Sequence, residues 1–131
     1  MPVILIVLFI TSAIPVSLAV LNACLRYKEF GEFDNNHPRI QQLQQKGIGA
    51  RVLAAQNNSW ETLQVFLLVT FIAFASQINL HSLTIVSLVF LFSRIAHAIC
   101  YITNYCWARS AFYGLGMGCC MYIFYLSVVN Y

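Results

Sequence analysis

Charged side chains are scarce in this chain, and their scarcity excludes a water-soluble domain. Only 8% of the 131 residues are Asp, Glu, Lys or Arg, whereas 60% are hydrophobic. A soluble domain carries about 25% charged residues, so this chain lacks the side chains that would cover a water-facing surface. The composition therefore predicts an integral membrane protein surrounded by membrane lipid.

Basic runs and close cysteine pairs are also missing. The net charge is only +3 and no Lys/Arg-rich run occurs, so we expect no nucleic-acid partner. The five cysteines contain no CxxC pair, so we expect no metal site. Because all five lie in or beside apolar stretches, we interpret them as small packing residues and not as a disulfide framework.

What the chain does have is long apolar stretches. At roughly 20 residues per transmembrane helix, four helices and short loops use the whole length. We predict an all-α integral membrane protein whose single domain, residues 1–131, is a four-transmembrane-helix bundle. No positive segment precedes the first stretch, so we do not expect a cleaved signal peptide. The expected spans are about residues 2–25, 48–76, 80–103 and 108–129.

The distribution of basic residues predicts the orientation of the bundle. Five Lys and Arg residues fall in or beside the first loop, Arg109 marks the third loop, and the second loop and both tails have none. Loops rich in Lys and Arg stay in the cytoplasm, so we expect loops one and three there and both termini on the same, non-cytoplasmic side. The membrane would be the inner membrane of a bacterium or an endoplasmic reticulum-type membrane of a eukaryote.

Polar residues nevertheless interrupt three of the apolar spans. A charge at membrane depth, such as Arg94, costs roughly 2.5–3.5 kcal/mol and points to a function or a partner. Residues three, four and seven apart share a helix face, so these residues form stripes that we expect to share one polar cavity. The stripes are Arg51, Asn58 and Glu61 on the second span, Arg94, His97 and Tyr101 on the third, and Arg109, Ser110 and Tyr113 at the start of the fourth.

Each of these residues also has a purely structural interpretation. Glu61 and Arg94 would form a plain buried ion pair, and His97 would make an interhelical hydrogen bond. Arg109 would anchor the cytoplasmic end of its helix, and Ser110 would be a helix-start residue. The functional alternative is a ligand: arginine forks suit carboxylates and Glu61 suits an ammonium, so a molecule with two carboxylates and one amine, such as glutathione, fits the set.

The same residues carry a resemblance to a known family, the membrane-associated proteins in eicosanoid and glutathione metabolism (MAPEG). It covers about residues 26–125, and the loop Asp34-Asn-Asn-His-Pro38-Arg39 is like one in the family's bacterial branch. The three motifs that resemble the family's are Arg51-Val-Leu-Ala-Ala-Gln-Asn-Asn58-Ser-Trp-Glu61 (R-x-x-x-A-x-x-N-x-x-E), Arg94-Ile-Ala-His97-Ala-Ile-Cys-Tyr101 (R-x-x-H-x-x-x-Y) and Arg109-Ser110-Ala-Phe-Tyr113 (R-S-x-x-Y).

The resemblance implies homotrimers of four-helix subunits, with glutathione bound between neighbouring subunits near the cytoplasmic face. It implies a membrane-bound glutathione-dependent transferase or peroxidase that acts on lipophilic electrophiles or hydroperoxides. The alternatives are a non-catalytic lipid-binding scaffold of the same family or a small transporter subunit.

The resemblance also implies roles for single residues. Arg109 would stabilise the glutathione thiolate and Ser110 would lie beside the sulfur, which makes these two the candidate catalytic residues. A nearby cation lowers the pKa of a thiol, ordinarily about 8.5, and so raises its thiolate fraction. The residues implied to bind glutathione are Asn58, Glu61, Arg94, His97, Tyr101, Tyr113, Arg51 and Arg26.

Some positions depart from the family pattern. Ala54 stands where many members have a second Arg, Gln56 replaces a frequent His, and Val65 replaces a common Pro. The loss of one cation weakens carboxylate binding or changes the substrate, so we do not expect the eicosanoid activities. Outside the motifs, Gly114 and Gly118 form a GxxxG pair, which predicts a close helix approach.

Overall fold

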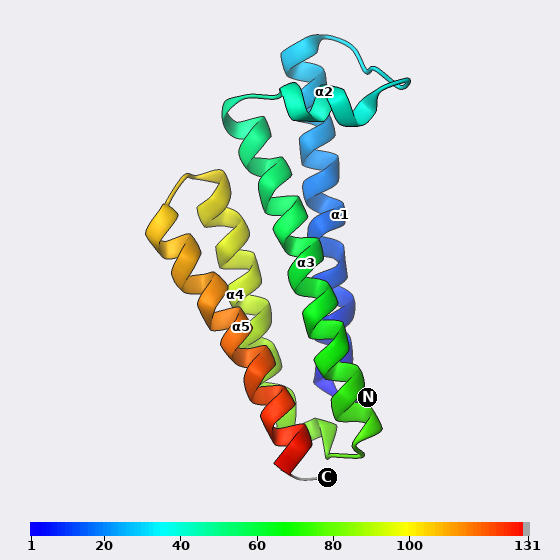
Figure 1. Cartoon of the computed structure of the whole chain (residues 1–131), viewed down its shortest axis with the longest axis vertical. Coiled ribbons are helices and arrows are strands. Elements are labelled where there is room, and N and C mark those ends of the chain that lie inside the picture. The colour runs from blue at the N-terminus through cyan, green and yellow to red at the C-terminus, as the bar shows by residue number, and fades with distance from the viewer. Residues whose placement is uncertain (130–131) are drawn as a thin grey trace.

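The computed structural model describes residues 1–129, and the last two residues of the predicted domain, 130–131, lie outside the described part. The described chain is helical and contains four helices long and apolar enough to cross a membrane. Figure 1 shows α1 beside α3, α4 beside α5, and the start of α1 and the end of α5 at the same end of the bundle. This confirms the all-α four-helix architecture. The elements are α1 (Val3–Phe30), α2 (Pro38–Gln44), α3 (Gly47–Ala75), the 3-10 turn η1 (Leu80–Leu83), α4 (Thr84–Ile102) and α5 (Cys106–Val129).

Helix α1 is longer than predicted and ends at Phe30 instead of near residue 25. The charged residues after the apolar run continue the helix until Gly31, which adopts a left-handed conformation with φ of +75°. The Gly31 N–H donates to the Tyr27 carbonyl at 2.8 Å, which is the usual way for glycine to end a helix. The helix thus continues past the end of the apolar run, and Gly31 ends it.

The segment between α1 and α3 is not a plain loop, because it contains the short helix α2. Helix α2 buries a polar side chain and exposes apolar ones: Gln41 is buried, whereas Ile40 and Leu43 are 54% and 79% exposed. The Gln41 side chain donates to the Glu32 carbonyl at 2.9 Å and accepts from the Asp34 N–H at 3.2 Å. A polar side chain can be buried when its hydrogen bonds are satisfied, and these bonds tie α2 to the loop that follows α1.

Two further contacts order this segment. Asn22 of α1 donates to the side chain of Gln45 at 2.9 Å and to the carbonyl of Gly49 at 3.1 Å, which ties α1 to the start of α3. The Asp34 carboxylate accepts the backbone N–H groups of His37 and Asn36, both at 2.9 Å. The bond from His37 is the main cause of a lowered pKa of the Asp34 carboxyl group.

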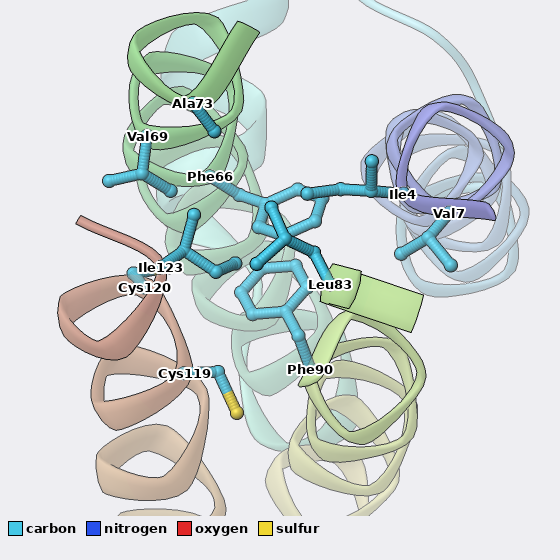
Figure 2. Packing of buried hydrophobic residues seen from close by; sticks show 10 residues of the cluster. All are labelled: Ile4, Val7, Phe66, Val69, Ala73, Leu83, Phe90, Cys119, Cys120 and Ile123. Carbon is cyan, nitrogen blue, oxygen red and sulfur yellow. The ribbon is translucent and has the colours of Figure 1, made fainter. Parts of the chain in front are cut away.

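The main apolar core lies in the half of the bundle that holds the termini. Phe66 of α3 and Phe90 of α4 stack there with ring centroids 3.9 Å apart, and side chains from α1, η1 and α5 surround the pair (Figure 2). All five cysteines are free thiols. Cys119 and Cys120 belong to this core, which agrees with a packing role for these two, whereas Cys24 and Cys106 are exposed within one subunit. The surrounding residues are Ile4, Val7, Val69, Ala73, Leu83, Cys119, Cys120 and Ile123.

Close packing of α5 against α4 falls at Gly116 and not at the GxxxG pair. A Cβ atom on Gly114 or Gly118 would meet nothing within 4 Å inside the subunit, whereas one on Gly116 would lie 2.9 Å from Ser93 Oγ and 3.8 Å from Arg94 Nη1. The absence of a side chain at Gly116 therefore makes room for Ser93 of α4, whereas Arg94 would be at an ordinary contact distance.

Candidate functional site

A cavity of about 250 Å³ lies between α3, α4 and α5, in the half of the bundle opposite the termini. All three polar stripes predicted from the sequence contribute to its wall. The structure thus brings together residues more than 50 positions apart in the chain. The lining residues are Asn58, His97, Tyr101, Arg109, Ser110 and Tyr113.

The turn between α4 and α5 places the last two stripes opposite each other. Asn104 adopts a left-handed conformation with φ of +66°, and the Tyr105 N–H donates to the Cys100 carbonyl at 2.9 Å. Asparagine tolerates this conformation better than most residues. The reversal sets Arg109, in the first turn of α5, against Tyr101, in the last turns of α4.

Arg94 lies behind the cavity wall and does not line it. Its side chain is only 2% exposed. Its Nη2 donates to Asn58 Oδ1 at 2.7 Å and contacts His97 Nδ1 at 3.2 Å, so one nitrogen joins α3 to α4. Its Nη1 has no hydrogen-bond partner among the described residues. Within one subunit, the lining residues Asn58 and His97 therefore stand between Arg94 and the cavity.

Arg109 is held by stacking. Its Cζ lies 4.4 Å from the centroid of the Tyr101 ring, a cation–π distance. The His97 ring packs against the same ring, with centroids 5.5 Å apart, and against the Tyr113 ring at 6.2 Å. These aromatic contacts keep a cation and an imidazole at one cavity wall.

Ser110 is exposed next to Arg109. Its hydroxyl donates to the Cys106 carbonyl at 3.1 Å, one helical turn earlier. Because a hydroxyl oxygen also has two acceptor lone pairs, this bond leaves Ser110 able to accept a hydrogen from a ligand.

Glu61 does not take part in the cavity wall. Its side chain is exposed, and the buried Glu61–Arg94 ion pair considered from the sequence does not form. Within residues 1–129 the one ion pair joins His37 Nδ1 to Asp34 Oδ2, at 3.6 Å.

The other two predicted arginines also lie outside the wall. Arg51 Nε donates to the Ile102 carbonyl at 3.0 Å and so binds the start of α3 to the end of α4. Arg26 Nη1 donates to the Pro38 carbonyl at 3.2 Å, and its Cζ lies 5.3 Å from the Phe33 ring. Within one subunit, both arginines support the framework of the site and do not form its wall.

Gly116 is the residue of this region that the sequence interpretation missed. It follows Arg109 by seven positions and Tyr113 by three, so it shares their helix face, and that spacing was the available signal.

For a metal ion the described residues offer little, since no group of three or more His, Cys, Asp or Glu side chains comes together within residues 1–129.

Comparison with known proteins points to one family. A family model described as the MAPEG family matches residues 2–129, which is nearly the whole chain. No curated protein matches the sequence. The match includes all three polar stripes and all four membrane-spanning helices.

Proposed function

The chain belongs to the MAPEG family of membrane proteins in glutathione and eicosanoid metabolism, and from that premise we propose that it is a glutathione-dependent transferase or peroxidase. Its second substrates would be lipophilic electrophiles or hydroperoxides. The single observation that carries the proposal is the shared cavity, in which three helices of an apolar bundle present an amide, an imidazole, a guanidinium and two phenols.

The wall suits the peptide part of glutathione. Arginine and amide donors bind carboxylates, and Arg109 and Asn58 offer such donors at the cavity. We propose that Asn58, His97, Tyr101 and Tyr113 bind the tripeptide. In a homotrimer, a neighbouring copy would cover the part of the ligand that reaches toward exposed residues such as Glu61.

Arg109 and Ser110 are proposed to act on the sulfur. The Arg109 cation favours loss of the thiol proton, which yields the nucleophilic thiolate. In transfer, the sulfur forms a bond to the electrophilic carbon and the leaving group departs with its bonding electrons. In peroxide reduction, the sulfur attacks an oxygen, the O–O bond breaks and the alcohol leaves after taking up a proton. A second glutathione then displaces the sulfur-bound hydroxyl as water and forms the disulfide.

The membrane supplies the second substrate. A lipophilic electrophile partitions into the apolar phase around the helices, so its local concentration near the cavity exceeds that in water. Placing a polar thiol site in an apolar bundle joins two reactants that otherwise stay in different phases.

Glutathione binding is the first test. We expect millimolar glutathione to raise the thermal midpoint of the purified protein in lipid nanodiscs, because a ligand at about 100 times its Kd stabilises the folded state by about 2.7 kcal/mol. No rise would overturn the proposal.

Turnover is the second part of the same test. With an activated aryl halide, we expect Arg109→Ala to abolish conjugation and the matched loop variant Arg39→Ala to retain it. Glutathione binding without turnover by the wild-type protein would instead support the non-catalytic lipid-binding scaffold.

A further inference from the structure

Arg94 is buried, charged and placed behind two lining residues, and nothing in the proposed reaction uses it directly. We propose that Arg94 is a positioning residue that sets the hydrogen-bond polarity of the cavity wall, so that Asn58 and His97 both present donors to an anionic group of the ligand. The identity of that ligand as glutathione rests on the proposed function, but the polarity of the wall does not.

The inference follows from what a guanidinium can do. It has five N–H donors and no acceptor. Its 2.7 Å bond to Asn58 therefore requires the carbonyl oxygen of that amide to face Arg94. The amide nitrogen, with its two hydrogens, is then the group that Asn58 offers to the cavity it lines.

The same reasoning decides the state of His97. Its Nδ1 lies 3.2 Å from Arg94 Nη2, so Nδ1 must accept and cannot carry a hydrogen. The imidazole is then neutral with its hydrogen on Nε2, and His97 also becomes a donor at the cavity. Without Arg94, each of these two side chains would be free to present an acceptor instead.

The positive charge of Arg94 also favours an anionic group in the cavity. Among the described residues no carboxylate lies within ion-pair distance of it, since the one ion pair there is His37–Asp34. A buried cation without a counter-charge is costly, and an anion in the adjacent cavity would reduce that cost.

A wall of donors selects one end of the ligand. Carboxylates and thiolates accept hydrogen bonds, whereas an ammonium group only donates them. We therefore expect a glutathione carboxylate, and not its ammonium, beside Asn58 and His97. The ammonium would lie farther away, toward an acid such as the exposed Glu61.

The state of His97 gives a test that is independent of turnover. With ¹⁵N-labelled histidine in the full-length protein, in lipid nanodiscs at neutral pH, the His97 signal, assigned by its loss in His97→Gln, should come from the neutral Nε2–H tautomer alone. Arg94→Lys should keep this signal, and Arg94→Leu should give a mixture of tautomers. An Nδ1–H or doubly protonated His97 in the wild-type protein would overturn the proposal, even if Arg94→Leu does not fold.

Asn58→Asp tests the wall itself. The aspartate can still accept from Arg94 and adds a counter-charge, so we expect thermal stability to be kept or raised. The substitution also replaces the amide donor that faces the anion in the cavity with an acceptor. The affinity for glutathione should therefore fall about 10- to 100-fold.

The matched control is Asn57→Asp, which adds the same charge at the neighbouring exposed position and should change affinity less than about 2-fold. Unchanged affinity in Asn58→Asp would overturn the proposal. A wild-type protein that fails to bind glutathione would overturn the proposed function, and the His97 signal would still decide the role of Arg94.

Discussion

The two halves of the bundle bury very different side chains on the same helices. Toward the termini, α3 and α4 meet through the stacked rings of Phe66 and Phe90, inside a core of ten buried apolar residues. Toward the opposite end, they meet through a hydrogen bond between Asn58 and Arg94 and through a smaller apolar cluster that includes Val52, Ala55 and Ala98. Along α4 the change from Phe90 to Arg94 takes four residues, about one turn.

The difference indicates a division of labour. The apolar half gains from dense packing, which in lipid is a main source of helix association. The polar half keeps a buried cation, Arg94, without an ion-pair partner among residues 1–129, and such a charge does not favour stability. We infer that the apolar half stabilises the bundle enough to tolerate a polar site at the other end.

The largest effect should come from breaking the apolar half. Phe66→Ala removes a fully buried ring and leaves a cavity, which costs about 3–5 kcal/mol of unfolding free energy. The matched control on the same helix is Phe71→Ala, whose side chain is 64% exposed and should cost far less. Thermal unfolding in lipid nanodiscs compares them, and equal losses would contradict the assignment of the core to this half.

A smaller effect is expected where the two halves join. Gly116→Ala places a Cβ atom 2.9 Å from Ser93 Oγ, and such overpacking costs about 1–3 kcal/mol. Gly118→Ala meets open space and should be neutral or stabilising by up to about 1 kcal/mol, because alanine is the better helix former. We therefore expect Gly116→Ala to lower the thermal midpoint and Gly118→Ala to keep or raise it. A lower midpoint in Gly118→Ala alone would refute this prediction.

The smallest effect should come from the stacking within the polar half. Tyr101→Leu removes the ring that lies 4.4 Å from Arg109 Cζ, a contact typically contributing about 0.5–2 kcal/mol. On the proposed function, we expect conjugation of an activated aryl halide to fall about 2- to 30-fold, since a tenfold change in rate corresponds to about 1.36 kcal/mol. Tyr101→Phe keeps the ring and should stay close to the wild type. Equal losses in both variants would assign the effect to the phenol hydroxyl instead of the stacking.

Several features of the site were predictable from helical period alone. Arg109, Ser110 and Tyr113 are close in sequence, and Arg94, His97 and Tyr101 follow one face of a helix, so their grouping is local. Glu61 was harder to place from the sequence. It shares the stripe of Asn58 by spacing, yet it is exposed within one subunit, because exposure depends on which neighbouring helix covers each side of the stripe.

Helix α2 shows the other limit of pattern reasoning. A run of glutamines reads as a water-facing loop, yet Gln41 and Gln45 are buried. Their partners, Glu32 and Asn22, lie 9 and 23 positions away. Burial of polar residues depends on such distant partners, which no local pattern contains.

The sequence by itself determined the class of the protein, the number of spans and the residues that interrupt them, because hydropathy and helical period are local properties. The tertiary structure decided what those residues do. It placed Arg94 behind Asn58, 36 positions away, and set Gly116 against Arg94, because donors, acceptors and space from different helices meet only when the helices pack. Arg94, a charge that the sequence places inside a span, is in the packed bundle buried and hydrogen-bonded to two residues of the cavity wall.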